Sequence, residues 1–416
     1  MSKDLTNIYI EGWENTQLGK RFSKMAFHMF TIDQLLSEYE TKGESVIRMT
    51  LGKSDQLLSN EVKDAMKEAL DYPKELLRVD SEGNPELRRV FSEHYSRRFW
   101  KKILPQNVIV GSQGTSSLYR DIFTMLLQSG GKVLLPKPGY ILYEAAASLL
   151  QVLRNDISID YYNIDIDSGR IDIDSFVKAF DKEHTRIVVV NSPGNPIGNL
   201  VSVQEWESII EIMNTGRRAV LFSDQVYSNM VFDKEPYISV LDEALNKKIK
   251  IPYIVTDSMS KGYEMYTFRV GFAIVPDELV FPLTIFQRNF SLTPNTISQI
   301  GAIQAIGQKD SVEKLREMYT CRYQKAIKEL ADISGIVPCP VSGGFYLLVN
   351  CRKYIVEHGL GGDLELAMKI AQHTSPHIGV TPGSDFGAEG CIRISFSPSD
   401  FDRGIKILAE YLQLYQ

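Results

Sequence analysis

The chain has 416 residues, of which 44% are hydrophobic and 24% charged, a composition typical of a globular protein with two domains or one large α/β domain with appendages. Its 46 Lys and Arg residues against 52 Asp and Glu residues give a formal charge of −6, which excludes a broad basic surface and argues against nucleic acid as a partner. No run of about 18 apolar residues could cross a membrane, and the first residues lack the apolar segment of a signal peptide, so we expect a cytoplasmic protein.

The first predicted elements are short. Apolar residues recur at helical spacing between positions 29 and 36, and residues 45–50 have the pattern of a strand. A turn precedes a predicted helix over residues 60–70, and Pro85 stands at an early position of the next helix, where its missing N–H costs nothing. Residues 1–50 are therefore predicted to form an N-terminal arm and part of a small domain.

From residue 107 to about 300, short apolar strands alternate with amphipathic helices. We predict strands at residues 108–110, 132–136, 186–191, 219–224, 251–256 and 269–275. Between two of them, Ser202 and Glu205 have the spacing of a capping box that begins a helix. Strands that are apolar on both faces and separated by helices predict a doubly wound, mostly parallel sheet, and we assign residues 51–310 to this large α/β domain.

Residues 311–416 are predicted to form a smaller C-terminal α+β domain. A helix extends to about residue 331, strands are predicted at residues 344–350 and 391–396, and a further helix lies near residues 364–372. The four cysteines all lie in this region at irregular spacing, and the six histidines show no ligand spacing. Neither a disulfide framework nor a metal site is predicted.

The stretch from Asp257 to Gly271 follows a buried strand and carries Lys261 between Ser258 and Arg269. Ligands collect at the strand ends of α/β sheets, and hydroxyl groups with an arginine favour an anion. A lysine amine at such a place can form a Schiff base with an aldehyde, including that of pyridoxal phosphate. Taken alone, the stretch also fits a solvated surface loop.

Other predicted strand ends carry polar groups. Gly114 and Thr115 lie between a strand and a helix, where the free N–H groups of a helix N-terminus suit a phosphate. The alternative is a plain turn with Thr115 or Ser116 as the N-cap. Asn195 follows the predicted strand at residues 186–191 in a Pro- and Gly-rich loop, either as an amide donor or as part of a tight turn.

Asp224 ends another predicted strand, where a partly desolvated carboxylate needs a cationic or N–H partner, although it could also be a helix N-cap. Tyr140 could stack on a cofactor or simply pack. Together, an anion site, an aromatic ring, an amide, a carboxylate and a lysine after successive strands of one sheet predict a planar, charged, phosphorylated cofactor.

These motifs resemble those of the fold-type I pyridoxal-phosphate enzymes, in particular the class I/II aminotransferase family. The segment Ser192-Pro-Gly-Asn-Pro-Ile-Gly198 is similar to the family's Asn-Pro-x-Asn-Pro-Thr-Gly, and Asp224-Gln-Val-Tyr227 is similar to Asp-x-x-Tyr. Ser258-Met-Ser-Lys261 with Arg269 matches Ser-x-Ser-Lys with an arginine eight residues later, and Arg393 matches the late arginine of the small domain. The resemblance covers nearly the whole chain.

The resemblance implies a role for each group. Lys261 would hold pyridoxal 5'-phosphate as a Schiff base and move a proton at the substrate α-carbon, while Asp224 would keep the ring nitrogen protonated. The other implied cofactor-binding residues are Tyr227 and Asn195 at the ring hydroxyl, Tyr140 stacked on the ring, and Gly114, Thr115, Ser258 and Arg269 at the phosphate. Arg393 would bind the substrate α-carboxylate, with the Gly52 backbone and Asn195 nearby.

Two positions depart from the family pattern. Arg78 stands where the family has a tyrosine that reaches the phosphate across a dimer interface, and Thr267 stands where many members have glycine, so the loop after Lys261 is expected to differ in shape. Lys53 and Arg78 could favour a substrate with an acidic side chain, or could be solvated surface residues.

We therefore predict a homodimeric aminotransferase that moves an amino group from an amino acid to a 2-oxo acid in two half-reactions. A pyridoxal-phosphate lyase that eliminates a β-substituent needs the same lysine and aspartate and is an alternative. A non-catalytic ligand-binding relative is a second alternative, against which the intact Lys261, Asp224 and Arg393 argue.

Overall fold

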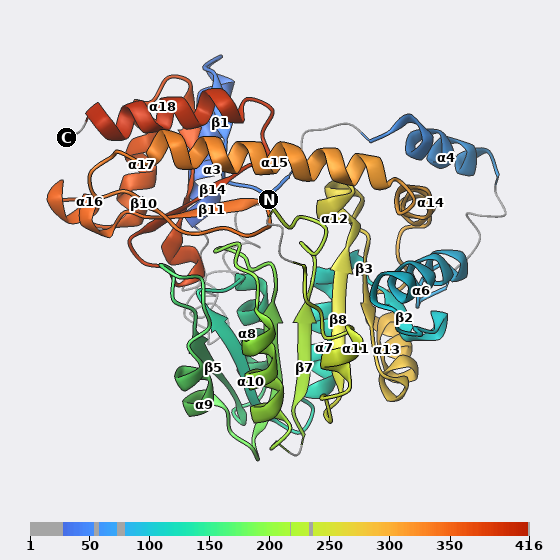
Figure 1. Cartoon of the computed structure of the whole chain (residues 1–416). Helices are drawn as coiled ribbons and strands as arrows, with labels where there is room; N and C mark the ends of the chain where they lie inside the picture. Colours follow the sequence, from blue (N-terminus) through green and yellow to red (C-terminus); the bar gives the residue numbers. More distant parts are fainter. Residues whose placement is uncertain (1–27, 54–57, 73–79, 217, 233–235, 415–416) are drawn as a thin grey trace, which may run out of the picture.

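The largest layer of the protein is a seven-stranded sheet. The structure, a computed structural model, describes residues 28–53, 58–72, 80–216, 218–232 and 236–414 (Figure 1). The strand order is β2 (Val108–Val110), β9 (Gly271–Ile274), β8 (Tyr253–Ser258), β7 (Val220–Asp224), β6 (Thr185–Asn191), β4 (Gly131–Lys137) and β5 (Ile157–Asn163). Only β9 is antiparallel to its neighbours. The prediction of a mostly parallel sheet is confirmed, and β5 is a strand that was not predicted.

Helices cover both faces of this sheet because its strands are apolar on both faces. In β4, Val133 and Leu135 belong to one core cluster, whereas Leu134 belongs to another. The first face packs against α7 (Thr115–Leu126), α8 (Ile141–Leu153) and α13 (Asp277–Phe290). The second packs against α6 (Pro85–Phe99), α9 (Ile173–Ala179), α10 (Val203–Met213) and α14 (Thr296–Ala305). This is the doubly wound arrangement.

A second layer combines the two ends of the described chain. Its four-stranded antiparallel sheet has the order β10 (Val337–Pro338), β11 (Tyr346–Asn350), β14 (Cys391–Ser395) and β13 (Thr381–Pro382), and β1 (Val46–Arg48) pairs in parallel with β12 (His377–Gly379). Around them lie α3 (His28–Thr41), α15 (Lys309–Leu330), α16 (Arg352–Glu357), α17 (Asp363–His373) and α18 (Phe401–Leu414). Domain boundaries at residues 50 and 310 stay a prediction.

The remaining elements are a further helix, α4 (Asn60–Asp71), which packs against α14, and several short connections. The connections are α11 (Glu243–Asn246), α12 (Met259–Gly262), β3 (Ser112–Gly114) and the 3₁₀ turns η2 (Pro105–Asn107), η3 (Tyr266–Phe268) and η4 (Gly383–Phe386). The longest helix, α15, has 22 residues. None of the helices in the described ranges is both long and apolar enough to cross a membrane.

Helix starts follow local capping chemistry. The predicted capping box is confirmed, because the Ser202 hydroxyl accepts from the Glu205 N–H and the Glu205 carboxylate accepts from the Ser202 N–H at 2.8 Å. Asn84 caps α6 just before Pro85. The expected alternative of Thr115 or Ser116 as N-cap of α7 is wrong, because Gly114 is the N-cap and has a φ of +70° that suits glycine.

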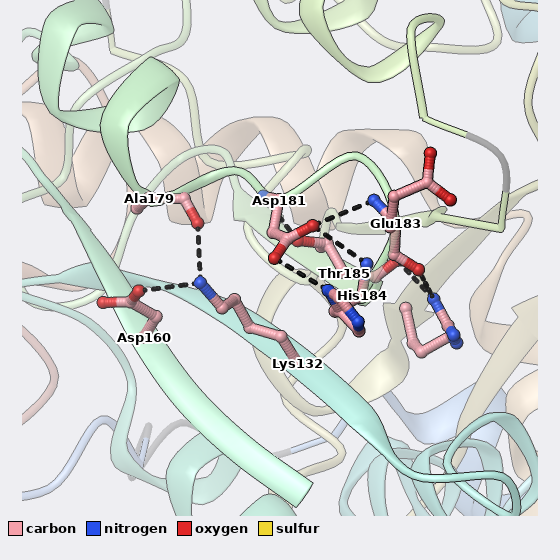
Figure 2. Close-up of polar contacts among 8 residues, drawn as sticks. Lys132, Asp160, Ala179, Asp181, Glu183, His184 and Thr185 are labelled. Atoms are coloured by element: carbon pink, nitrogen blue, oxygen red, sulfur yellow. Dashed lines mark hydrogen bonds and ion pairs between the residues drawn. The ribbon is translucent and has the colours of Figure 1, made fainter.

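The amino ends of β4 and β6 are fixed by a separate set of polar contacts (Figure 2). Lys132 Nζ donates to Asp160 Oδ2 at 3.1 Å and to the Ala179 carbonyl at 3.3 Å. Asp181 pairs with His184 Nδ1 at 2.9 Å and accepts from the His184 N–H at 3.1 Å. These contacts hold the pKa of Asp181 down, at about 2. These contacts stabilise the end of the sheet at which its parallel strands begin.

The capping box gives a direct stability test. Ser202→Ala removes the hydroxyl that accepts from the Glu205 N–H, so the free energy of unfolding should fall by about 1 kcal/mol. Urea unfolding followed by circular dichroism measures this. Ser208→Ala is the matched control, because the half-buried Ser208 hydroxyl bonds to the Gln204 carbonyl within the same helix, and this change should be close to neutral. Equal stability of Ser202→Ala and the wild type would show that the box does not stabilise α10.

Candidate active site

A pocket of about 360 Å³ is lined by residues at the carboxyl ends of β6, β7 and β8 and by residues of the second layer. Every predicted site residue except Gly114 lines it, and Gly114 lies beside one of the lining residues, Arg269. The lining also includes residues that were not predicted, among them Tyr119, Tyr143 and Tyr346. The structure thus brings together side chains from segments more than 300 residues apart in the chain.

Lys261 lies in α12, the single turn that follows β8. Its Nζ donates to the Gly52 carbonyl at 2.6 Å and lies 5.1 Å from the centre of the Tyr266 ring. Burial lowers the pKa of Lys261, and Tyr346 opposes this shift. The amine therefore faces the pocket rather than bulk water, and more of it is in the neutral, nucleophilic form than for an exposed lysine.

Asp224, the last residue of β7, is buried under the pocket and held by hydroxyl groups. Its Oδ2 accepts from Tyr119 Oη at 2.6 Å and from the Tyr143 hydroxyl, and its Oδ1 accepts from Thr256 Oγ1 at 3.2 Å. Burial raises the pKa of Asp224, although the hydrogen bonds from Tyr119 and Tyr143 oppose it. A cationic N–H group placed at this carboxylate would stabilise its ionised form.

The N-terminus of α7 and Arg269 form an anion-binding corner. Arg269 has a left-handed φ of +55°, and its guanidinium donates to the carbonyls of Tyr266 at 3.0 Å and Gln113 at 3.3 Å. A Cβ added at Gly114 would lie 3.4 Å from Arg269 Nη2, so the backbone approaches the guanidinium closely. The free N–H groups at the start of α7, together with this cation, suit a phosphate.

Ser258, the last residue of β8, lines the same corner. It is the N-cap of α12, where its hydroxyl oxygen accepts from the Ser260 N–H at 2.8 Å and its hydroxyl lies 3.3 Å from the Val270 carbonyl. The hydroxyl can therefore shift its proton toward a ligand without losing its capping role.

Arg393 in β14 forms the opposite wall. Its Nη1 donates to Asn195 Oδ1 at 3.0 Å and its Nη2 donates to the Thr50 carbonyl at 2.6 Å. Its Nε is buried and has no partner among the described residues. Since the Asn195 oxygen is used by Arg393, the amide NH₂ of Asn195 is the end left to act as a donor. A buried guanidinium with a spare N–H is suited to a carboxylate.

Aromatic rings complete the pocket. Tyr140 lies edge-to-face with Tyr143 at 5.5 Å between ring centroids, and Tyr227 lies edge-to-face with Tyr346 at 6.1 Å. Tyr227 is buried, and burial raises the pKa of its phenol. These rings form apolar walls that a flat ring could occupy, with hydroxyl groups at their edges.

Asp257 supports α12 from the face of β8 opposite to Thr256. It accepts from the Tyr95 hydroxyl, from Ser228 Oγ at 3.0 Å and from the Ser258 N–H at 2.6 Å. Burial raises its pKa to about 6. Asp257 was noted in the sequence only as the start of the lysine stretch, and its support of the Lys261 turn follows from the alternation of side chains along β8.

Tyr119 and Tyr143, which donate to Asp224, were not identified from the sequence. Tyr119 lies one helical turn beyond Thr115 and Tyr143 lies three residues after Tyr140, so both fit ordinary apolar packing in the sequence. A buried phenol needs a partner, and this need is the signal that could have linked them to a buried carboxylate.

Three residues that were singled out in the sequence are not among the described residues that line the pocket. Lys53 is exposed and does not line the pocket, and Arg78 lies outside the described residues. Thr267 lies in the exposed turn η3 directly before the left-handed Arg269. The effect of these residues on substrate choice and loop shape stays a prediction.

The chain is similar in sequence and in fold to known proteins. A model of the family described as aminotransferase class I and II matches residues 44–412. An aspartate aminotransferase of Bacillus sp. strain YM-2 is 27% identical over 368 residues, which cover 87% of this chain and 90% of that protein.

Solved structures share the fold. The aspartate aminotransferase of Rhizobium meliloti has a TM-score of 0.83 with 22% identity, covering 94% of this chain and 96% of the other. An alanine aminotransferase of Pyrococcus furiosus has a TM-score of 0.80 with 24% identity, covering 95% and 99%.

The raised pKa of Asp257 predicts a pH dependence of stability. An unfolded aspartate titrates near 3.8 and Asp257 near 6, so the folded protein binds more protons between these values. The proton bound to Asp257 therefore adds about 3 kcal/mol at most to the free energy of unfolding. This stabilisation is fully present below the pKa of the unfolded state and is lost as the pH rises through the pKa of the folded state.

In the wild type, Asp257 should make the free energy of unfolding fall as the pH rises from about 4 to about 6. Asp257→Asn removes the titrating group, so this fall should become smaller. Urea unfolding at a series of pH values measures it. Asp332→Asn, at an exposed position, is the control and should keep the wild-type profile. An unchanged profile in Asp257→Asn would contradict the assignment.

Proposed function

Because this chain belongs to the class I and II aminotransferases, we propose that the pocket around Lys261 binds pyridoxal phosphate and one amino acid or 2-oxo acid at a time. Aminotransferases of this family depend on pyridoxal phosphate in general, and this protein is an aminotransferase. The observation that carries the assignment of the site is the Lys261 amine, which faces the same pocket as Asp224 and Arg393.

The residues present fit the cofactor by their chemistry. The N-terminus of α7, Ser258 and Arg269 would hold the phosphate, and the buried carboxylate of Asp224 would pair with the ring nitrogen. Tyr140 would lie against the ring, while Tyr227 and the Asn195 amide would donate to the ring hydroxyl. The unpartnered Nε of Arg393 supports a carboxylate as the remaining ligand.

When bound, pyridoxal phosphate supplies an aldehyde that condenses with amines and a ring that accepts electron density from the substrate α-carbon. Lys261 would contribute the amine that holds the cofactor, and its lowered pKa favours the neutral form of that amine. Lys261 Nζ would also take the proton from the substrate α-carbon and return a proton later.

Arg393 and Asp224 would orient the two reacting partners. Arg393 would bind the substrate α-carboxylate through a charge-assisted pair, with Asn195 and Thr50 fixing the guanidinium. Asp224 would keep a proton on the ring nitrogen, and the hydroxyls of Tyr119 and Tyr143 hold that carboxylate in place. Fixed positions of this kind lower the entropic cost of the reaction.

The relatives and structural neighbours named above are aminotransferases, so elimination of a β-substituent is not the favoured reaction. We propose that the protein works as a homodimer and acts on a small amino acid and a 2-oxo acid. Relatives named for aspartate support a dicarboxylic substrate, for which Lys53 and Arg78 are the candidate additional cations. The apolar residues Met29, Leu51 and Phe386 in the pocket lining would instead suit a neutral side chain.

Lys261→Ala tests the proposed function directly. The variant should stay folded but lose the visible absorption that pyridoxal phosphate gives on capture by a lysine, because no amine remains at that position. Addition of an amino acid and then of a 2-oxo acid should bleach and restore the absorption of the wild type only. Release of ammonia with pyruvate by the wild type would instead indicate elimination. Lys182→Ala, an exposed lysine at the opposite end of the sheet, should behave as wild type.

Arg393→Lys tests carboxylate binding. Loss of the forked guanidinium should raise KM for the amino acid and for the 2-oxo acid by about 10- to 100-fold, equivalent to about 1.5–3 kcal/mol. Steady-state kinetics with both substrates measure the change, and the exposed Arg403→Lys serves as the control. Unchanged KM values for both substrates would rule out Arg393 as the carboxylate ligand.

A further inference from the structure

Tyr346 reaches the Lys261 amine from the second layer of the protein. It is the first residue of β11, where it pairs with Ser395 of β14, while Arg393 pairs with Leu348 two residues further on. Because alternate residues of a strand share a face, Tyr346 and Arg393 point to the same side of this sheet. That side faces the pocket, and both residues line it.

The hydroxyl of Tyr346 is held in a narrow space. A Cβ added at Gly52 would collide with the Tyr346 hydroxyl and would lie 3.1 Å from Lys261 Nζ. The Arg393 guanidinium carbon lies 3.9 Å from the centre of the Tyr346 ring. Only 5% of Tyr346 is exposed. The phenol oxygen, the Gly52 backbone and the lysine amine therefore converge at one point.

The charges around this point favour a shared proton. Burial alone would raise the pKa of Tyr346, but Lys261 and Arg393 together lower it, helped by hydrogen bonding with Tyr227 and Lys261. Tyr346 in turn raises the pKa of Lys261 against the effect of burial. The other titratable or charged groups that face the pair are Tyr227 after β7, Tyr140 before α8, Tyr266 in η3, Arg269 after η3, and Asp33 in α3 beyond Arg393.

We propose that the Tyr346 hydroxyl is the proton partner of the Lys261 amine. In one state the phenol keeps its O–H bond and Nζ is neutral; in the other the O–H bond has broken, a new N–H bond has formed, and an ammonium faces a phenolate. One proton moves and the total charge of the pair does not change.

This role rests on the proposed function, in which Lys261 must first be a neutral nucleophile and later exchange protons with the substrate α-carbon. A phenol in contact with Nζ can accept or return the proton directly within the pocket. The competing explanation is that Tyr346 only supports Arg393 through ring stacking. Tyr346→Phe distinguishes the two explanations, because it removes the hydroxyl and keeps the ring that stacks on Arg393.

The first measurement uses the protein without cofactor. Lysines are reductively methylated with ¹³C-formaldehyde, Lys261 is assigned by the loss of its signal in Lys261→Arg, and its pKa is read from the NMR shift against pH. Tyr346→Phe should lower the pKa of Lys261 by about one unit or more, since a partner that favours the charged amine is lost. Tyr253→Phe, which loses a hydroxyl bonded to Asn246 outside the pocket, should leave it unchanged.

The second measurement follows a single half-reaction of the loaded enzyme with an amino acid carrying deuterium at the α-carbon. Tyr346→Phe should slow the step by about 100-fold and increase its isotope effect, with KM nearly unchanged because the ring still supports Arg393. Tyr346→Leu, which also removes the ring, should raise KM as well.

An unchanged Lys261 pKa in Tyr346→Phe, or a loss of activity confined to KM, would overturn the proposal. A wild-type protein that gave neither the visible absorption nor amino transfer would instead refute the proposed function, and the cofactor-free titration would still decide whether Tyr346 and Lys261 share a proton.

Discussion

The strand register of the large sheet is the constraint on which the site depends. Asn191, Asp224 and Thr256 are direct partners across β6, β7 and β8, so an amide, a carboxylate and a hydroxyl stand in a row at the strand ends. A shift of one residue in any of these strands would turn its polar side chain to the other face of the sheet, away from the other two members of the row. The apolar cores on both faces prevent such a shift, and thus the packing of Val188 or Leu221 positions the chemistry at the pocket floor.

The pocket brings together buried charges of both signs. Lys261, Arg269 and Arg393 line it, together with two buried carboxylates, Asp224 and Asp385. Three cations in one cavity are costly unless each has acceptors. Backbone carbonyls of Gly52, Thr50 and Gln113 supply them in the absence of ligands. An anionic cofactor and an anionic substrate would complete this compensation, which explains why a site with such a charge balance can fold and still bind negative ligands.

Local patterns predicted much of this structure from the sequence. The strands ending at Asn191 and Asp224 and the capping box at Ser202 were accessible because apolar periodicity and turn chemistry are local signals. Tyr346 and the Gly52 carbonyl were not linked to Lys261, because contacts between residues so far apart depend on tertiary packing. The alternative that Thr115 or Ser116 is the N-cap of α7 was wrong. The N-cap is Gly114, and its backbone conformation cannot be inferred from the hydroxyl groups of the two residues that follow it.

The pairing of β1 with β12 also bears on how the chain is made. Val46 lies beside His377, and Leu36 of α3 packs against the same late segment through Gly379. During synthesis β1 therefore lacks its β12 partner until the segment around residue 377 has left the ribosome, whereas the strands of the large sheet emerge earlier and can pair with each other. The Gly52 carbonyl that meets Lys261 follows β1 closely in the chain, so the pairing of β1 with β12 helps to position it. The Lys261 side of the pocket thus depends on a segment that is synthesised more than 300 residues after Gly52.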